Sequence, residues 1–357
     1  MAAPLRPVGV HLRRTEENSD EIDTLATLTG GRAGIDAVLD DLDRRGRRRW
    51  VPGLAVSHGF TWEREDRATH DWWPQGITTS ADASDTEDIA GRKVLAVSWY
   101  AKHGQGSRIS FVDLHELRYR HVLLVQPVVR DGVVDLEALP VHAGGIVWCG
   151  PYLHVAGTAK GLFTCRLDDL LRIPDHLFDP DEARIGRQDD GRLAAHGYRY
   201  VLPVRFTYQA RADQGTTKLR YSFLSLDRTG AEPRVIAGEY GRAQQSRRLA
   251  SFALDRETSH LVVGEDGLAR PEELGDGEPG MQGAALVDGT WYATQSHGAW
   301  GPGSLWVGQP GRLRERRWAL PMGPEDIAYW PSLDTFWSVS EHPHRRWVYA
   351  VRRGRVG

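Results

Sequence analysis

A repeated pair of apolar runs is the feature that most constrains the fold of this chain. Each copy has an apolar run, a polar loop and a second apolar run, and turn residues separate the copies. Short apolar runs between turn residues predict β-strands, and self-similarity at a period of about 50 residues is typical of a β-propeller. Five copies occur, at residues 94–100 with 108–113, 153–158 with 161–167, 235–240 with 248–254, 290–296 with 304–307, and 336–341 with 346–351.

Further apolar segments complete each copy. Four of the pairs are preceded by a further strand that begins with a similar turn sequence, at residues 73–77, 142–146, 281–284 and 324–327. In the third copy this position is taken by residues 219–226. Outer strands are expected at 120–125, 200–206, 260–263 and 317–320, and residues 54–60 would supply the one missing from the fifth copy. Closure of that kind removes exposed sheet edges. The sequence therefore predicts an all-β fold, a five-bladed β-propeller with an insertion near residues 168–198, and a pair of β-sandwiches is the alternative.

The first 52 residues have a different pattern. Residues 19–21 are a helix start signal, and Ile35, Val38, Leu39 and Leu42 recur at helical spacing. This spacing predicts a short amphipathic helix over 34–45 that ends in the basic run 44–49, whose cations suit a helix C-terminus. We therefore predict an N-terminal extension at 1–52 with a short helix, and a propeller domain at 53–357.

The charge balance excludes some partners. The chain has 45 Lys and Arg against 48 Asp and Glu, a net charge of −3, so it has no basic excess for nucleic acid or an acidic membrane. No run of about 18 apolar residues predicts a membrane helix, and no secretion signal is apparent at the N-terminus. Two cysteines provide neither a disulfide framework nor a cysteine-rich zinc site. We expect a cytoplasmic protein without nucleic acid or membrane partners, and the sequence leaves its oligomeric state open.

Several short strings resemble a family of actinobacterial five-bladed propeller proteins, mostly uncharacterised and often secreted. They are Trp73-Pro-Gln-Gly-Ile77, residues 107–113 and 119–125, His142-Ala-Gly-Gly-Ile146, residues 281–283, and residues 323–327 with 340–343. The string Pro324-Glu-Asp-Ile327, followed by a second strand, is more distantly similar to gluconolactonase-like and strictosidine-synthase-like propellers. These likenesses imply a propeller fold, and the distant ones imply either hydrolysis with an axial calcium or a ring-forming condensation.

Propeller geometry gathers residues that are distant in the sequence. In each blade the first two strands are antiparallel, so the starts of first strands and the ends of second strands lie on one face of the ring. The catalytic candidates at these positions are Glu325, Glu341, His142 and Glu239. The substrate-binding candidates are Trp73, Gln75, Trp99, Tyr100, His103, Thr158, Tyr240, Gln282, Gln295, His297 and His342.

These residue types suit acid–base chemistry on an apolar substrate. Partial burial raises a carboxyl pKa toward neutrality, and histidine titrates there already. Aromatic rings facing a cavity hold an apolar ligand and stabilise a cation, and the expected rings are Trp72, Trp73, Trp99, Tyr100, Tyr240, Trp300 and Trp330. The alternatives are structural: Glu325 would cap a turn, Glu341 would pair with Arg345 or Arg346, the histidines would be satisfied locally, and tryptophans would pack between blades.

We therefore predict an enzyme that transforms a hydrophobic, natural-product-type small molecule, terpenoid or indole-like, as a cyclase, isomerase or lyase without a cofactor. Calcium or magnesium held by Glu325, Asp326, Gln75 and Gln282 is the first alternative, because carboxylate and amide oxygens suit these cations. That set would support a metal-assisted lactonase or related hydrolase. The second alternative is a non-catalytic binding propeller, with the basic run 44–49 as part of an interaction arm.

Overall fold

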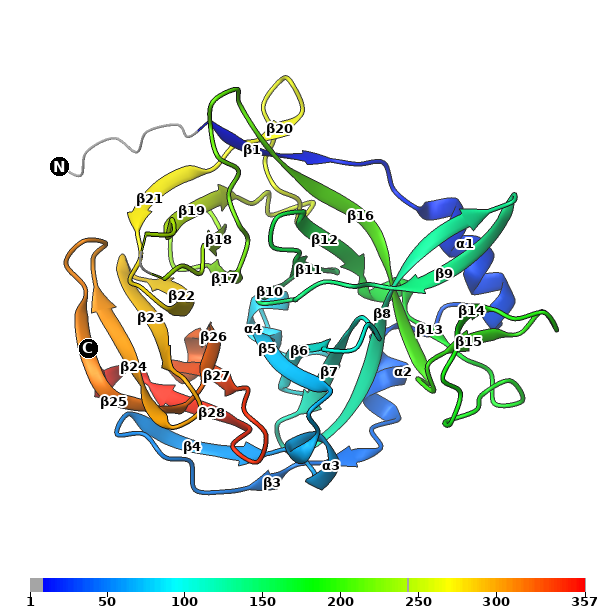
Figure 1. Cartoon of the computed structure of the whole chain (residues 1–357), viewed down its shortest axis with the longest axis horizontal. Helices are drawn as coiled ribbons and strands as arrows, with labels where there is room; N and C mark the ends of the chain where they lie inside the picture. Colours follow the sequence, from blue (N-terminus) through cyan, green and yellow to red (C-terminus); the bar gives the residue numbers. More distant parts are fainter. Residues whose placement is uncertain (1–8, 243, 357) are drawn as a thin grey trace.

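Antiparallel sheets are arranged in a ring around a central axis in the computed structural model of the chain (Figure 1). The structure describes residues 9–242 and 244–356. The first strand of each successive unit lies nearest the axis and contacts the next one around the ring, and these inner strands are β5 (Trp72–Thr79), β10 (Ile146–Cys149), β17 (Phe223–Asp227), β22 (Met281–Val287) and β26 (Pro324–Trp330). The fold is therefore mostly β and propeller-like.

Each inner strand begins an antiparallel series that runs outward from the axis. The second and third strands occupy the five predicted pairs of apolar runs. They are β6 (Val94–Ala101) with β7 (Ser107–Asp113), β11 (Tyr152–Ala156) with β12 (Gly161–Arg166), β18 (Arg234–Gly238) with β19 (Arg248–Ala253), β23 (Thr290–His297) with β24 (Gly301–Gly308), and β27 (Thr335–Ser340) with β28 (Trp347–Arg352). The outer strands are β8 (Arg118–Arg130), β16 (Tyr200–Ala212), β21 (Glu272–Asp276), β25 (Arg314–Met322) and β4 (Val56–Thr61).

The ring is closed by a strand from near the N-terminus. β4 pairs antiparallel with β28, from Trp347 opposite Thr61 to Val351 opposite Val56. This confirms the predicted closing role of residues 54–60. The short strand β3 (Arg47–Arg48) lies outside β4, and its exposed arginines suit an edge strand because charge there discourages pairing with another chain.

The number of blades stays a prediction. β16 pairs in parallel with β8 from Val201 to Pro203, and this pairing joins the first two units into one sheet of 13 strands. The insertion between β12 and β16 contains β13 (Leu171–Arg172), β14 (Ile185–Arg187) and β15 (Leu193–Ala195). β9 (Val133–Ala138) pairs with the end of β8.

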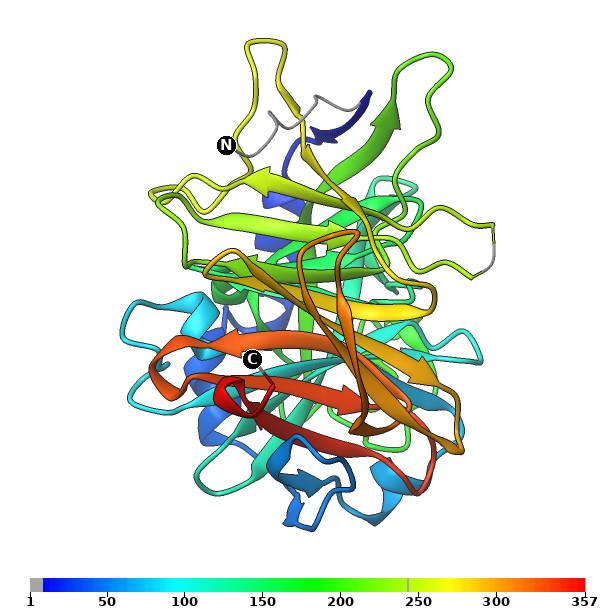
Figure 2. The same cartoon turned by 90° about the vertical axis from the view of Figure 1, so that its left-hand side faces the viewer.

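The N-terminal segment lies along the outside of the ring. β1 (Val10–Arg14) pairs with both β16 and β20 (Leu268–Ala269), and Figure 2 shows β1, the end of β16 and the β20 hairpin projecting together on one side. Residues 1–8 lie outside the described part, and the boundary after residue 52 stays a prediction. In the part of the chain that is described, no helix has the length and apolar character needed to cross a bilayer.

Two local predictions are wrong. The helix expected over 34–45 is only α2 (Gly34–Asp40), because Arg118 of β8 binds the carbonyl of Leu42 at 3.0 Å and the next residues pair with β8 as β2 (Arg44–Arg45). The outer strand expected at 260–263 is absent, since Leu261 makes only an isolated bridge and β21 takes that position. The other helices are α1 (Ser19–Thr29), α3 (Arg64–Ala68) and α4 (Ser80–Ala83), with short 3₁₀ turns at Leu167–Asp169, Pro331–Leu333 and Arg353–Arg355.

Glycines at or near the starts of the inner strands lie where neighbouring inner strands are in contact. A Cβ on Gly145 would lie 2.0 Å from the backbone nitrogen of Leu224 in β17, and one on Gly283 would lie 2.6 Å from the Cα of Asp326 in β26. Gly76 of β5 approaches the backbone of β10 in the same way. Backbone contact at this range leaves no room for a side chain, so the inner ring requires glycine there.

Candidate functional site

Irregular pairing occurs at the same place in three inner strands. The register shifts between Pro74 and Ile77 in β5, between Met281 and Gly283 in β22, and between Pro324 and Ile327 in β26. Such irregularities redirect side chains and occur preferentially near functional sites. The polar residues within them are Gln75, Gln282, Glu325 and Asp326. The axis therefore carries a cluster of polar side chains where an ordinary strand would continue its regular alternation.

Two glutamates in this region share a hydrogen bond. Glu325 is the second residue of β26, and Glu341 directly follows β27, whose Ser340 pairs with Pro324. Their carboxyl groups are in hydrogen-bonding contact. Glu325 is buried, whereas 18% of the Glu341 side chain is exposed. Because two carboxylates cannot hydrogen-bond without a proton between them, the pair holds at least one proton.

The surroundings assign this proton to Glu325. Burial raises the pKa of Glu325 well above its ordinary value, and the negative charges of Glu341 and Asp326 add to the effect. Burial also raises the pKa of Glu341, but a hydrogen bond from Gln75 and the positive charges of Lys102 and Arg346 act to lower it. The favoured state is therefore a neutral Glu325 that donates to a charged Glu341.

Two glutamines hold the pair from both sides. Gln75 of β5 donates through Nε2 to Oε2 of Glu341 at 3.3 Å, and Gln282 of β22 donates through Nε2 to Oε1 of Glu325 at 3.2 Å. Thr294 donates to the backbone carbonyl of Glu325 at 2.6 Å. Three neighbouring inner strands thus fix the orientation of both carboxyl groups.

Aromatic and cationic side chains surround Glu341. The imidazole of His342 lies edge-on to Trp73 with ring centroids 5.7 Å apart, and its Nε2 is 3.6 Å from Oε1 of Glu341. Nζ of Lys102 lies 3.6 Å from the Trp73 ring centroid. Arg346 is buried and donates through Nε to the backbone carbonyl of Glu341 at 2.7 Å. Sequence reasoning missed Lys102 and Arg346 as site residues, although both lie beside strand ends on the predicted face.

A small cavity borders Tyr100 and His142, and neither glutamate of the pair is among its lining residues. It has a volume of about 220 Å³ and is lined by Tyr100, Ala101, Gly104, Gly106, Pro140, Val141 and His142. The rings of Tyr100 and His142 are in contact, with centroids 4.3 Å apart. Burial raises the pKa of Tyr100, with smaller contributions from the charges of Glu341 and Glu325, which places the phenol near both carboxyls. Burial lowers the pKa of His142, so its imidazole is neutral at pH 7.

The predicted acid–base role of Glu239 is not supported by its surroundings. This buried carboxylate accepts hydrogen bonds from the backbone N–H groups of Arg220 at 3.1 Å and Arg248 at 3.0 Å, and from the Arg248 guanidinium at 2.8 Å. Burial acts to raise its pKa, but the hydrogen bonds from Arg248, Ser246 and Arg220 together outweigh burial, so the pKa of Glu239 is lowered. Glu239 therefore favours its charged form and anchors its loop.

The predicted substrate-binding role of Trp99 also lacks support from its position in the structure. Trp99 is fully buried and donates through Nε1 to Oγ of Ser110 at 2.8 Å. Burial lowers the pKa of His121 to about 4, so this histidine is neutral, accepts from Ser110 at Nδ1 (2.8 Å) and donates from Nε2 to Asp66 (2.9 Å). This chain of hydrogen bonds crosses one sheet and uses the indole N–H of Trp99 within the core.

The remaining candidates have local partners instead. Five predicted substrate-binding residues contact the following groups: His103 with Asp71, Thr158 with Tyr221, Tyr240 with Arg242, Gln295 with Pro279 and Trp306, and His297 with Ser304. Of the other expected mouth aromatics, Trp72 and Trp330 are buried, and Trp300 is 82% exposed beneath Arg345. The expected aromatic lining thus reduces to Trp73 and Tyr100.

Of the residues expected to hold calcium or magnesium, Gln75 and Gln282 donate hydrogen bonds to Glu341 and Glu325 instead. Oδ2 of Asp326 accepts a hydrogen bond from the backbone N–H group of Ile77 at 3.4 Å, whereas Oδ1 is buried without a hydrogen-bond partner. Across residues 9–242 and 244–356, no three His, Cys, Asp or Glu side chains are grouped so as to hold a metal ion. The metal-assisted alternative therefore gains no support from this geometry.

Fold and site together define a propeller-like protein with a proton-sharing glutamate pair near its axis. No family model matches the chain, and no curated protein matches it.

Solved structures give distant likenesses. One is a gluconolactonase from Xanthomonas campestris, with 13% identity, coverage of 88% of this chain and 86% of that chain, and a TM-score of 0.34. A second is a β-xylosidase/α-arabinofuranosidase from a compost microbial metagenome, with 8% identity, coverage of 82% and 94%, and a TM-score of 0.35. A third is Drosophila Semaphorin 1b, with 10% identity, coverage of 86% and 85%, and a TM-score of 0.26. Likeness at this level carries no inference about activity.

The buried glutamate gives a prediction about stability. A carboxyl whose pKa is raised by folding binds more protons in the folded protein between the two pKa values, so the free energy of unfolding falls as pH rises across that interval. Glu325→Gln keeps the shape and removes the titration. We expect the variant to lose less stability than the wild type between pH 5 and pH 9, as measured by urea denaturation.

Glu315→Gln is the matched control, because a hydrogen bond from Arg317 lowers the pKa of Glu315. Its removal should leave the slope of stability above pH 6 unchanged. Equal slopes for wild type and Glu325→Gln would contradict the assignment of a buried proton to Glu325.

Proposed function

We propose that this chain is an enzyme that transfers protons on a small molecule at the Glu325–Glu341 pair, as an isomerase, lyase or cyclase. The observation that carries the proposal is the pair itself, in which the Glu325 carboxyl is buried with its pKa raised well above the ordinary value and the neighbouring Glu341 carboxyl is partly exposed. A general base works best when its pKa is close to the working pH. Burial raises the pKa of Glu341 toward that range.

The surrounding groups support a definite division of roles. Glu341 removes a proton from a substrate carbon, and the Lys102 ammonium stabilises the negative charge that then develops on a conjugated oxygen. Return of the proton to a different carbon completes an isomerisation, whereas departure of a leaving group completes an elimination. Glu325 and Gln75 are positioning residues, because both act on the substrate through their hydrogen bonds to Glu341.

The cavity supports a compact substrate with an apolar part. About 220 Å³ is below the range of roughly 300 to 1,000 Å³ that drug-sized ligands occupy. The rings of Tyr100 and Trp73 favour an apolar or unsaturated portion, and Lys102 favours a carbonyl oxygen. We therefore propose a small unsaturated carbonyl compound of the natural-product type as the substrate.

Exchange of carbon-bound hydrogen tests this function without knowledge of the product. The protein is incubated in deuterated water with a library of small cyclic and unsaturated carbonyl compounds, and deuterium incorporation is measured by mass spectrometry. We expect at least one compound to exchange with the wild type and not with Glu341→Gln. Exchange that persists in Glu341→Gln and requires added Ca²⁺ would indicate metal-assisted chemistry, and absence of exchange throughout the library would contradict the proposal.

A further inference from the structure

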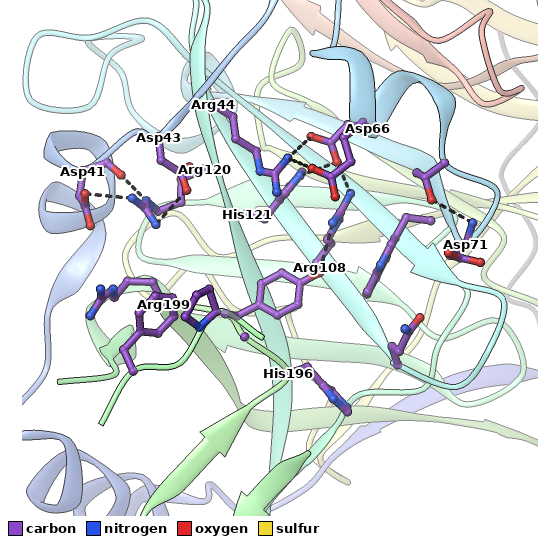
Figure 3. A pocket seen from close by; sticks show the side chains of 18 of the residues that line it. Asp41, Asp43, Arg44, Asp66, Asp71, Arg108, Arg120, His121, His196 and Arg199 are labelled. Carbon is purple, nitrogen blue, oxygen red and sulfur yellow. Dashed lines mark hydrogen bonds and ion pairs between the residues drawn. The ribbon is translucent and has the colours of Figure 1, made fainter. Parts of the chain in front are cut away.

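A second cavity has neither glutamate of the pair in its lining, and Figure 3 shows it from close by. Its volume is about 590 Å³, within the range of small-molecule sites. Asp66 of α3, Arg108 of β7 and His121 of β8 form one part of its lining. The insertion between β12 and β16 provides another part, which includes Phe178 and Tyr198. None of its lining residues belongs to the 220 Å³ cavity beside Tyr100.

The charges that line this cavity are balanced. Its arginines are Arg44, Arg108, Arg120, Arg172 and Arg199, and its acidic residues are Asp41, Asp43, Glu65, Asp66 and Asp71. Each of these arginines is in an ion pair: Arg44 and Arg108 with Asp66, Arg120 with Asp41, and both Arg172 and Arg199 with Asp175. An anion would meet the carboxylates and a cation would meet the guanidinium groups, so the lining favours neither.

Two polar atoms in the lining are buried without a hydrogen-bond partner. One is the donor Nε of Arg108, whose side chain is only 6% exposed, and the other is the acceptor Oε1 of Gln105. A buried polar group without a partner is costly, so a small rotation of either side chain toward a bound ligand would gain a hydrogen bond. Since a hydroxyl group both donates and accepts, it satisfies either atom.

The side chain of Arg108 is held in place by its other atoms. Its guanidinium donates to Asp66 at 2.8 Å and to the hydroxyl of Tyr198 at 3.1 Å, and it stacks 4.5 Å from the ring centroid of Trp72. A side chain fixed by three contacts loses little entropy when a ligand binds, which favours recognition.

The insertion is also held in a defined conformation. Gly197 has φ of 72° and the preceding His196 has φ of 50°, so two consecutive residues are left-handed. A Cβ at Gly197 would lie 2.3 Å from the carbonyl oxygen of Pro180. This tight turn leads directly to Tyr198, which therefore reaches Arg108 from a preformed loop.

We propose that this cavity binds a neutral polyhydroxylated molecule, a saccharide or a related polyol. Paired carboxylates and guanidinium groups place hydrogen-bond acceptors and donors side by side. Each hydroxyl group of a polyol both donates and accepts, so it can bond to both kinds of group. Trp72, Phe178 and Tyr198 supply apolar surface for the carbon–hydrogen faces of such a ligand. The proposal does not depend on the chemistry of the axial glutamates.

Calorimetric titration of the full chain tests the proposal with named probes. D-glucose, cellobiose and myo-inositol are the neutral probes, and D-glucuronate and D-glucosamine are the charged counterparts of glucose. We expect at least one neutral probe to bind saturably, and we expect both charged sugars to bind at least tenfold more weakly than the best neutral one. Binding of a charged sugar with equal or higher affinity would overturn the proposal, as would the absence of binding by all three neutral probes.

Two variants locate the binding. Gln105→Leu removes the free acceptor at similar volume, and Tyr198→Phe removes the hydroxyl that orients Arg108; each should weaken binding of the neutral probe at least tenfold. Gln295→Leu is the matched control on β23 and should bind as the wild type does. Thermal unfolding confirms that each variant folds. Undiminished binding by a folded Gln105→Leu together with a folded Tyr198→Phe would refute the assignment to this cavity.

Discussion

Replacing Glu341 by glutamine is expected to lower kcat/KM for the proposed proton transfer by about 10²- to 10⁴-fold, the usual contribution of a positioned general base. Glutamine keeps the size of the side chain and its contact with Gln75, but it cannot accept a proton from carbon. The fold should be retained, because Glu341 is partly exposed at the end of β27. The measurement is steady-state kinetics on the compound that exchanges deuterium.

Glu325→Gln separates a catalytic from a positioning role. A neutral glutamine at this position keeps a donor toward Glu341 and removes a second carboxyl from the pair. We therefore expect a smaller loss of kcat/KM than for Glu341→Gln, accompanied by a shift of the pH profile. Equal losses in both variants with an unshifted profile would contradict the assignment of the base to Glu341.

The strand pattern was predictable because each unit repeats one local arrangement. The apolar runs and their turns are properties of short segments, so β6, β7, β27 and β28 follow from the sequence directly. The parallel pairing of β16 with β8 joins segments about 80 residues apart and has no local signal. For the same reason the strand β21 was missed, since it is recognised only by its partner β19.

The candidate site was predictable in part. Antiparallel strand ends bring Glu325, Glu341, Gln75 and Tyr100 to one region, and this follows from the order of the strands alone. Which way a side chain points depends on the alternation within a strand. Consecutive residues of β6 face opposite sides, so Tyr100 borders the 220 Å³ cavity whereas Trp99 is buried within the fold.

The sequence also does not show which glutamate carboxylates are hydrogen-bonded by a nearby arginine. Glu239 sits at a strand end like Glu341, but it accepts several hydrogen bonds from Arg248, which follows nine residues later on the adjacent strand. Arg346 donates to the backbone carbonyl of Glu341 and not to its carboxylate. Arg346 therefore does not occupy the carboxylate of Glu341 as Arg248 occupies that of Glu239. The difference lies in side-chain geometry that only the folded chain specifies.

Replacing Gly145 by alanine is expected to cost about 3 kcal/mol of the free energy of unfolding or more, the upper part of the range for overpacking. The added Cβ would lie 2.0 Å from the backbone nitrogen of Leu224 and 2.5 Å from the carbonyl carbon of Phe223. Backbone atoms cannot rotate away as a side chain does, so β10 and β17 would have to separate. Urea denaturation of the purified variant measures the loss.

Gly354→Ala is the matched control, because its Cβ would have no heavy atom within 4 Å, and we expect a change within about 0.5 kcal/mol. If Gly145→Ala were as stable as the control, the inner strands would not be in backbone contact. The same contact governs the site, since β5, β22 and β26 hold the two glutamines and Glu325 in register. A separation that spreads around the ring should therefore weaken the glutamate pair as well, and lowered deuterium exchange in a folded Gly145→Ala would connect the packing of the axis to its chemistry.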